Sequence, residues 1–511
     1  MARHIIHKQQ IILNIPKREE AHAFQNRVDV LLQQELASSM EDVFDEMFPA
    51  NEIIRIDSLQ LNLGNVSAQN FEQEFKDHFI QELRKNLSVK KDKLGDENST
   101  EVLSTSQSAF NAFIYFLENG YLPWYSATKE MSAWEGDILS SFSGNKNQYF
   151  FNWLRDNYKH TPVVLQRLIW QFTDSFLENM MLTIAPVTNE PWRLIYIDIS
   201  TILNNCTRGH INDRNMVWKC LFHALMNDPV LWNNTSFSGA EDSELIFRTL
   251  LLLTEHFDIP AADITAFENI SKLLATNIVQ NAFQELQLFQ VAQQELKNDP
   301  EKNKGNRQAD NNENIPDEKP DKDAERNNEG RLRPRNKKYT GISKEESLFV
   351  KNSGAVILHY FLKPFFAGLG LLADGKFKDE NTHQRAVLLF HYLATGSTNA
   401  AEFDLTLEKI LCGFPLEETL PAAIILKKKE KTESKKLLEA VIDHWTPLKN
   451  TSIEGLRNSF FERDGKLTKR ENGWLLTIEQ KTVDVLLGKL PWGFSTIRLP
   501  WMQQILNVDW Y

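Results

Sequence analysis

The chain has 511 residues, which allows two to four domains, and its 57 Lys and Arg against 69 Asp and Glu leave a net charge of −12. Because phosphate binding depends on clustered Lys and Arg, this balance argues against a general nucleic-acid binder. The 21 Gly and 18 Pro are fewer than the roughly 12% usual in proteins, which favours long helices over a turn-dense all-β fold. A hydrophobic share of 42%, with 32 Phe and 12 Trp, is enough to build cores.

Cysteine usage and hydropathy narrow the expected cellular context. Three cysteines are too few for a disulfide scaffold and indicate a reducing compartment, so we expect a cytoplasmic protein. The opening MARHIIHKQQ contains no apolar signal-peptide core. The most apolar stretch, residues 354–373, is interrupted by His359, Lys363 and Pro364, and is therefore interpreted as a buried helix and not as a membrane span.

Residues 1–88 are predicted to form a small β-α-β-α domain. The β-rich residues 4–15 indicate a first strand, and from Ala21 the apolar side chains recur every three or four positions, as in a helix. Residues 52–64 alternate apolar and polar, which predicts a second strand with a bulge or twist near Asp57. A second helical stripe of Phe and Leu follows.

The middle of the chain is predicted to be helical. A polar stretch, residues 89–104, is interpreted as a linker, and residues 105–296 contain successive amphipathic segments separated by Asn, Asp, Gly and Pro. This pattern is typical of a helical bundle or of stacked helices.

Residues 297–344 are predicted to be a disordered charged linker. Of the 42 residues 297–338, 22 are charged and none is aromatic, so the segment cannot bury enough apolar area to offset chain entropy. Fully extended, these 42 residues would reach about 140 Å, and as one helix about 63 Å.

Residues 345–511 are predicted to form a helical domain with a small sheet near its end. Helical patterns occupy residues 345–450, and the stretch 466–479, KLTKRENGWLLTIE, is interpreted as a β-hairpin. The predicted fold class is therefore α+β and predominantly α-helical.

Few motifs in the sequence indicate chemistry. GLLADGKF, residues 370–377, resembles a phosphate-binding loop, but Phe377 stands where Ser or Thr would hold Mg²⁺, and the segment follows a helix. His383 and His391 lie two helical turns apart without a third ligand at suitable spacing. No catalytic residue, no metal ligand and no cofactor is predicted. The lysine run 427–436 indicates either contact with phosphate or an acidic partner, or a solvated helix start.

The tripeptide LPW occurs three times, and the last residues contain a further tryptophan. Proline fixes a turn and the adjacent Trp can anchor a large apolar area, so these side chains are either the core of a small domain or a partner-binding surface. The candidate surface residues are Trp124, Trp492, Trp501, Met502 and Trp510.

Several long motifs resemble one known family. HIIHKQQIIL at residue 4, IRIDSLQLNLGNV at residue 54 and FLENGYLPWYS at residue 116 are similar to the N-terminal region of contractile injection system tape measure proteins. NSGAVILHYFLKPFFAGLGLL, RAVLLFHYLATG and LEKILCGFPL, which begin at residues 352, 385 and 407, resemble the C-terminal region of that family. The resemblance covers most of residues 1–124 and 348–511.

The resemblance implies a structural part of a phage-tail-like machine. A tape measure lies in the tube lumen during assembly and sets tube length or initiates the tube at the baseplate. The implied partners are inner-tube proteins, spike or hub and baseplate proteins, and a tail terminator or cap, with a homo-oligomer in the lumen as a further possibility and with neither nucleic acid nor a membrane span. The alternatives are a helical adaptor or effector-loading chaperone of the same machine and, from another class, an enzyme at the GLLADGKF loop.

Overall fold

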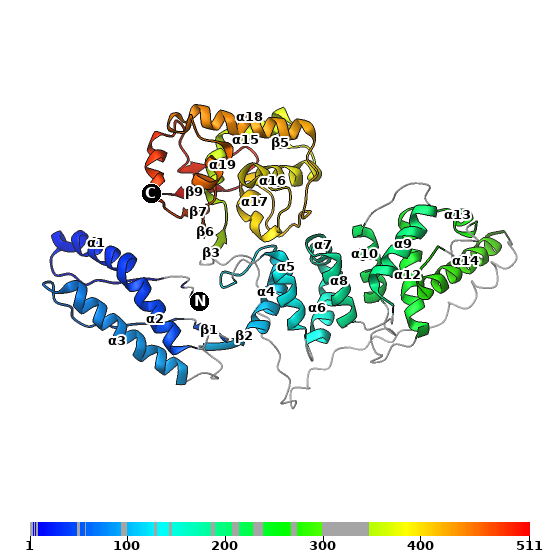
Figure 1. The fold of residues 1–511 in the computed structure, drawn as a ribbon, viewed down its shortest axis with the longest axis horizontal. Helices are drawn as coiled ribbons and strands as arrows, with labels where there is room; N and C mark the ends of the chain where they lie inside the picture. Colours follow the sequence, from blue (N-terminus) through cyan, green and yellow to red (C-terminus); the bar gives the residue numbers. More distant parts are fainter. Residues whose placement is uncertain are drawn as a thin grey trace, which may run out of the picture. The chain divides into compact units, whose positions relative to one another are not determined.

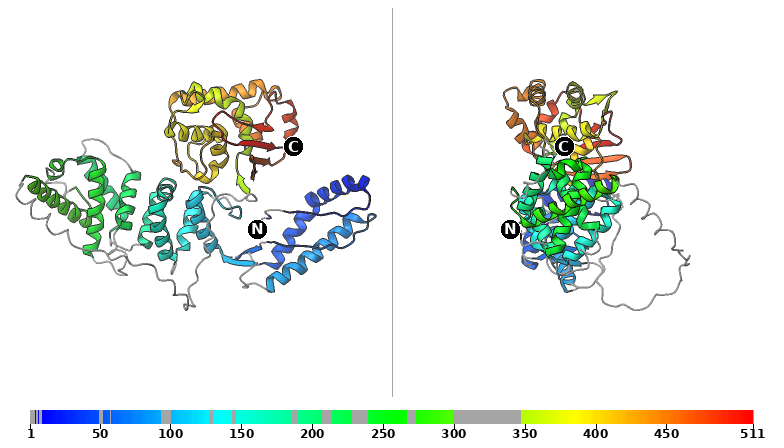
Figure 2. Two further views of the ribbon diagram at one scale, coloured as in Figure 1. Left: turned by 180° about the vertical axis from the view of Figure 1, so that it is seen from behind. Right: turned by 90° about the vertical axis from the view of Figure 1, so that its right-hand side faces the viewer.

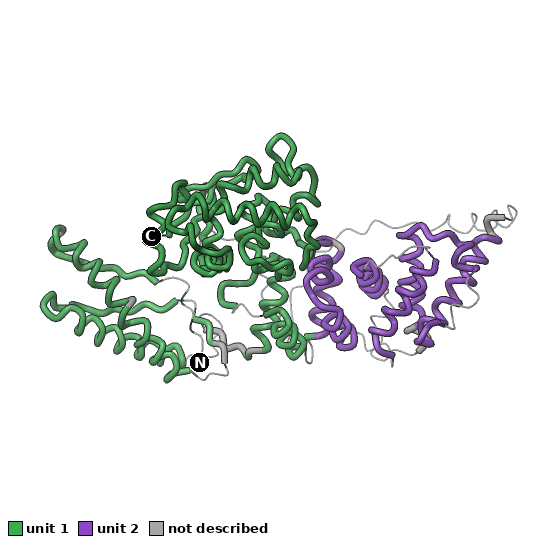
Figure 3. The backbone as a smooth tube through the Cα atoms, turned by 45° about the horizontal axis from the view of Figure 1, so that its top comes forward, with its two compact units in different colours: residues 1–146, 346–511 green, residues 147–345 purple. Residues whose placement is uncertain are grey.

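The structure, a computed structural model, divides into two compact units that are described separately. Unit 1 comprises residues 1–146 and 346–511, and unit 2 comprises residues 147–345 (Figure 3). Within the described residues helices predominate (Figures 1 and 2), and none of these helices is both long and apolar enough to cross a membrane. The residues described are 4, 6, 9–48, 52–56, 58–92, 100–126, 130–142, 146–184, 190–206, 214–227, 239–266, 273–298 and 347–510. The predicted linker residues 299–344 lie outside them.

The N-terminal part of unit 1 is built on two helices that run in the same direction. The first is continuous through α1 (Ala21–Leu31), the π-helical turn η2 (Leu32–Leu36) and α2 (Ala37–Met47), and the second is α3 (Phe71–Asp92). Three ion pairs join them in the same order along both: Arg27–Glu72, Glu35–Lys76 and Glu46–Arg84. We call this arrangement the parallel helix pair (Figure 1).

An apolar core and a charged rim hold the parallel helix pair together. Phe71, Phe75 and Phe79 follow one another at four-residue spacing on α3 and pack in one core with residues of α1 and α2. At the rim, the Arg27 guanidinium donates two hydrogen bonds to the Glu72 carboxylate, which lowers the pKa of Glu72 to about 2. The predicted amphipathic helices of this region are therefore present.

The predicted strands of this region are formed only in part. Glu52–Ile56 is strand β1 and pairs antiparallel with β2 (Thr100–Ser104), whereas residues 9–15 and 58–63 are extended but belong to no strand. The prediction of a strand over residues 4–15 is thus wrong for its described residues, because no neighbouring strand hydrogen-bonds to them. The apolar side chains of both segments still have a structural role, since they pack onto the core of the helix pair.

Helices α4 (Thr105–Asn119) and α5 (Met131–Ser141) complete the first part of unit 1. The Ser104 hydroxyl accepts a hydrogen bond from the Gln107 amide and caps α4, which ends at Gly120 in the left-handed region at φ 80°. Phe116 of α4 and Trp134 of α5 both make edge contacts with the ring of Phe403, at centroid distances of 5.7 and 5.5 Å. One aromatic side chain thus joins these helices to the later part of the same unit.

Unit 2 is helical throughout its described residues, as predicted for the middle of the chain. Specific polar contacts connect helices that are not consecutive. Arg214 at the start of α10 donates to the Asp174 carboxylate at the start of α8 and to the carbonyl groups of Ile169 and Phe172. Its helices are α6 (Lys146–His160), α7 (Pro162–Gln171), α8 (Asp174–Ile184), α9 (Trp192–Cys206), α10 (Arg214–Asn227), α12 (Gly239–His256), α13 (Ala261–Thr265) and α14 (Asn277–Asn298).

The start of α14 is capped by carboxylates from a distant part of unit 2. Asp198, buried within α9, accepts hydrogen bonds from the amides of Ala275 and Thr276, at 2.9 and 2.8 Å, and from the Thr276 hydroxyl at 2.5 Å. Glu190 accepts from the Asn277 amide at 3.0 Å. The carboxylates satisfy amides that the helix itself leaves unbonded and place negative charge at the positive end of its dipole.

Replacement of Asp198 by Ala should destabilise unit 2 by about 2–4 kcal/mol, because three donors, two of them on buried Thr276, lose their acceptor. The measurement is urea unfolding of the full chain with hydrogen exchange read at the α14 amides. Glu255→Ala, at an exposed position of α12, is the matched control and should leave both readouts unchanged. Equal exchange at α14 in the two variants would show that Asp198 does not hold this helix.

The second part of unit 1, residues 347–510, contains a five-stranded sheet and is called the C-terminal domain. The strand order is β3-β6-β7-β9-β8, and all neighbours are antiparallel except β7 and β9. The predicted hairpin at 466–479 is confirmed as β6 and β7, joined by a tight turn. The strands are β3 (Ser347–Val350), β6 (Gly465–Arg470), β7 (Gly473–Ile478), β8 (Thr496–Ile497) and β9 (Ile505–Asp509).

Helices and short helical turns surround this sheet (Figures 1 and 2). The residues before α15, predicted to be helical, instead form β3 and the 3-10 helix η5 (Ser353–Leu358). The larger helices are α15 (His359–Gly368), α16 (Glu380–Thr395), α17 (Thr406–Cys412) and α18 (Lys428–His444). The shorter elements are β4 (Leu372–Ala373), β5 (Lys376–Phe377), η6 (Glu402–Leu405), η7 (Thr446–Leu448), α19 (Ile453–Leu456), η8 (Arg457–Phe461) and η9 (Thr482–Lys489).

Candidate functional site

The five candidate surface residues do not form one cluster. Trp501, Met502 and Trp510 are buried in the C-terminal domain, and Trp492 is half-buried in the same domain. Trp124 is half-buried in the turn after α4 and lies in ring contact with Tyr125. No ring contact joins Trp492, Trp501 and Trp510 to one another.

Trp501 fills the space between α15, α17 and the β4–β5 hairpin. Its indole N–H donates to the Leu411 carbonyl at 2.9 Å, and its ring contacts Phe366 and Phe377 at centroid distances of 5.7 and 5.1 Å. Gly413, at φ 67°, ends α17 beside it, and a Cβ there would lie 2.5 Å from the Trp501 carbonyl oxygen. This tryptophan therefore closes the interior of the domain.

Trp510 takes part in a buried ionic cluster. Its indole N–H donates to the Asp484 carboxylate at 3.2 Å, and Arg463 donates to the other oxygen of that carboxylate at 2.9 Å. The side chains of Trp510 and Arg463 are both almost fully buried, and the Lys481 amide also donates to Asp484. The carboxylate thus joins η9 to the segment between η8 and β6 and to the residue that follows β9.

Replacement of Asp484 by Ala should cost about 3–5 kcal/mol of stability, because it leaves the Arg463 cation buried without its counter-charge. Trp510→Phe keeps the ion pair, loses one hydrogen bond and should cost about 1–2 kcal/mol. Chemical denaturation followed by tryptophan fluorescence measures both, and Asp509→Ala, at an exposed position of β9, is the control. The assigned role is contradicted if the Asp484 variant unfolds no earlier than the control.

Trp492 belongs to an aromatic cluster that reaches the surface. Its indole N–H donates to the Ile357 carbonyl at 3.0 Å, while Tyr360 stacks on it at 5.8 Å and Phe361 meets it edge-on at 5.0 Å. Tyr360 is 63% exposed, which is unusual for a ring stacked on a tryptophan. Sequence analysis missed Tyr360, because a single tyrosine within an apolar run carries no distinguishing pattern. We call Tyr360, Phe361 and Trp492 the aromatic surface cluster.

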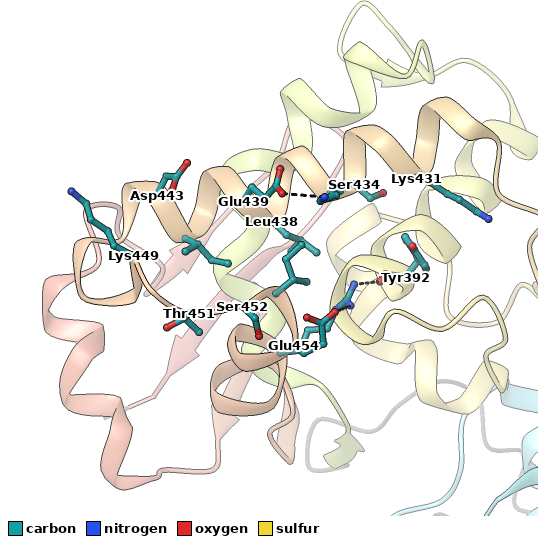
Figure 4. Close-up of a pocket in the computed structure, with 14 residues that line it drawn as sticks. Tyr392, Lys431, Ser434, Leu438, Glu439, Asp443, Lys449, Thr451, Ser452 and Glu454 are labelled. Atoms are coloured by element: carbon teal, nitrogen blue, oxygen red, sulfur yellow. Dashed lines mark hydrogen bonds and ion pairs between the residues drawn. The ribbon is translucent and has the colours of Figure 1, made fainter.

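A charged groove of about 850 Å³ lies along α18 (Figure 4). Lys431, Lys435, Lys449 and Arg457 line it together with Glu439, Asp443 and Glu454, so four bases face three acids. Lys435 is 3.5 Å from Glu439, and Arg457 donates to the carbonyl groups of Tyr392 and Leu393. Where the lysine run 427–436 meets this groove, its positive charge is therefore largely balanced by the acidic side chains that line the groove.

The GLLADGKF segment is a β-hairpin. β4 and β5 pair through Leu372–Phe377 and Ala373–Lys376, and the two turn residues Asp374 and Gly375 have φ of 50° and 77°. This is the geometry of a tight hairpin turn, whereas a phosphate-binding loop passes directly into a helix after its Lys. Phe377, at the position that would need a hydroxyl, packs on Trp501 and His383.

The two histidines considered as metal ligands have local partners, and the cysteines are buried. His383 Nε2 donates to the Cys412 carbonyl at 2.8 Å, and burial lowers the pKa of His383. His391 lies 3.4 Å from Glu408 in the interior. Burial raises the thiol pKa of Cys206 to about 11, and burial also raises the thiol pKa of Cys412 well above its usual range. Over the described ranges, no group of three or more His, Cys, Asp and Glu is arranged to hold a metal ion.

Comparison with known proteins identifies one family. The family model described as contractile injection system tape measure protein matches residues 3–510. No curated protein and no solved structure matches the chain.

Proposed function

We propose, from the premise that the chain belongs to the contractile injection system tape measure protein family, that it lies in the lumen of the inner tube during assembly and sets the tube's length. The match over essentially the whole chain carries this proposal. The role is structural: the protein acts through its length and its contacts with other components of the machine. Its partners would be inner-tube subunits, the spike or hub with the baseplate, and a terminator or cap.

The charged segment 297–338 supports the proposal because it is suited to act as a spacer. A spacer must change length without disturbing a folded core, and this segment has 22 charged residues in 42 and no aromatic residue. The net charge of −12 would also complement a basic lumen wall.

Duplication of residues 297–338 should lengthen the tube. The added 42 residues contribute about 140 Å if the spacer is extended and about 63 Å if it is helical, so the increment also reports its conformation. Tube lengths are measured by electron microscopy of particles assembled in cells that carry only the altered chain.

Two controls separate the effect of the spacer's length on the tube from the effect of its composition. A scrambled 297–338 segment of unchanged length should give normal tubes, and 42 Gly and Ser residues appended after Tyr511 should not lengthen them. If duplication leaves the length distribution unchanged, the length-setting role fails. A fall in particle number without a change in length would then favour initiation of the tube at the baseplate.

The aromatic surface cluster favours a second candidate function, an adaptor or effector-loading chaperone of the same machine. Exposed aromatic side chains are enriched among residues that dominate binding at interfaces, and Tyr360 is supported from beneath by Trp492. The cluster would serve either function, because tube length setting also needs contacts with tube or spike proteins. The two functions differ in which partner the cluster contacts.

Tyr360→Ala should weaken partner capture about tenfold, a typical loss at such a position, while folding is preserved because the ring is mostly exposed. Affinity purification from cells expressing the machine, followed by quantitative mass spectrometry, measures the loss. Val485→Ala, 77% exposed, is the matched control. Loss of tube or spike proteins supports length setting, loss of a toxin cargo supports the adaptor, and unchanged capture removes the cluster from both.

A further inference from the structure

Two extended segments in the N-terminal part of unit 1 have backbones without strand partners. Residues 9–15 and 58–63 run as extended chain, yet among described residues neither belongs to a sheet. Within the described part of the chain, the one bonded backbone group of these segments is the Leu63 carbonyl, which accepts from His78. Rows of unbonded N–H and C=O groups along extended chain are a template for pairing with another strand.

The two segments run in the same direction over the same helices. Each leads into the start of one member of the parallel helix pair, residues 9–15 into α1 and residues 58–63 into α3. Ile11 and Leu13 of the first, and Leu59, Leu61 and Leu63 of the second, pack onto the core of that pair. In an ordinary β-α-β unit such segments would be hydrogen-bonded neighbours in a parallel sheet.

The width of the helix layer explains why they are not neighbours. Two helices packed about 10 Å apart cover a layer about 20 Å wide, whereas strands in a sheet are about 4.8 Å apart. Such a layer has room for about four strands, and the chain supplies two. The sheet is therefore short of about two strands.

The opposite faces of the segments indicate what completes the sheet. Ile12 points away from the helix pair and is 77% exposed, so residues 11–13 are apolar on both sides, as in a strand buried between two layers. The outward residues of the other segment, Ser58, Gln60 and Asn62, are polar and suit an edge strand. Whatever completes the sheet must therefore supply the missing strands and an apolar layer that covers Ile12.

We propose that a second copy of this chain completes the sheet. The two copies would be related by a twofold axis parallel to the strands. Residues 9–15 of both copies would then form the two central strands and residues 58–63 of both copies the two edge strands, and all four strands would be parallel. The helix pair of one copy covers one face and that of its partner covers the other. This order places in the middle the segment whose outward face carries Ile12 between Gln10 and Asn14, and places outside the segment whose outward residues are all polar. It also supplies both missing strands.

The test is the mass of the purified full chain at increasing concentration, by light scattering or sedimentation, and it is independent of tube assembly. We expect a species of twice 59.2 kDa. Ile12→Pro removes an N–H that is unbonded in the single copy and needed in the sheet, and Ile12→Lys places a charge between the two layers. Both variants should return the mass to that of one copy while the far-ultraviolet circular dichroism is unchanged.

Ile425→Lys is the matched control, because Ile425 of the C-terminal domain is 92% exposed and lies outside the interface. Hydrogen exchange adds a second readout: amides of residues 9–15 should become protected only at concentrations where the dimer forms. A single-copy mass at all concentrations, a dimer that both Ile12 variants leave intact, or protection that persists in the single copy would each overturn the proposal.

Discussion

The C-terminal domain depends on the requirement that a buried indole N–H must find an acceptor. Trp445 donates to the Leu486 carbonyl, Trp492 to Ile357, Trp501 to Leu411 and Trp510 to Asp484. Three of these four bonds join the last part of the chain to residues 41 to 135 positions away, and each fixes one ring in one orientation. Because an indole without its acceptor would be costly in the interior, these bonds specify how the short helical turns close around the sheet.

The same requirement explains why the LPW repeats were ambiguous in the sequence. A Pro-Trp pair predicts a turn with a large apolar anchor, but the acceptor that decides between interior and surface lies far away in the chain. Leu411 and Ile357 contribute only their carbonyl groups, so their side chains give no signal. Tyr360 stacks on Trp492 and stays exposed, and no spacing rule in the sequence identifies that contact.

Local signals predicted the helices and the hairpin, and failed where pairing is distant. The β6–β7 hairpin was predictable because both strands and their turn are contiguous. β3 pairs with β6 more than a hundred residues later, and its short apolar sequence SLFV has no period that separates strand from buried helix. Residues 4–15 were predicted to be a strand from their β-rich composition, but composition shows only that side chains suit a strand, and a strand also requires a partner.

The two parts of unit 1 differ in whether their extended segments are hydrogen-bonded to neighbouring strands. In the C-terminal domain every strand has a neighbour within the chain, and its exposed edges, β8 with two residues and β3 with four, are short, which limits association through the sheet. Beside the parallel helix pair, two extended segments with apolar side chains toward the core have no strand neighbour among the residues that the structure describes. The proposed role in assembly requires some contacts that only other molecules satisfy, and the unpaired backbone of residues 9–15 and 58–63 would supply such contacts without cost to the folded core of the helix pair.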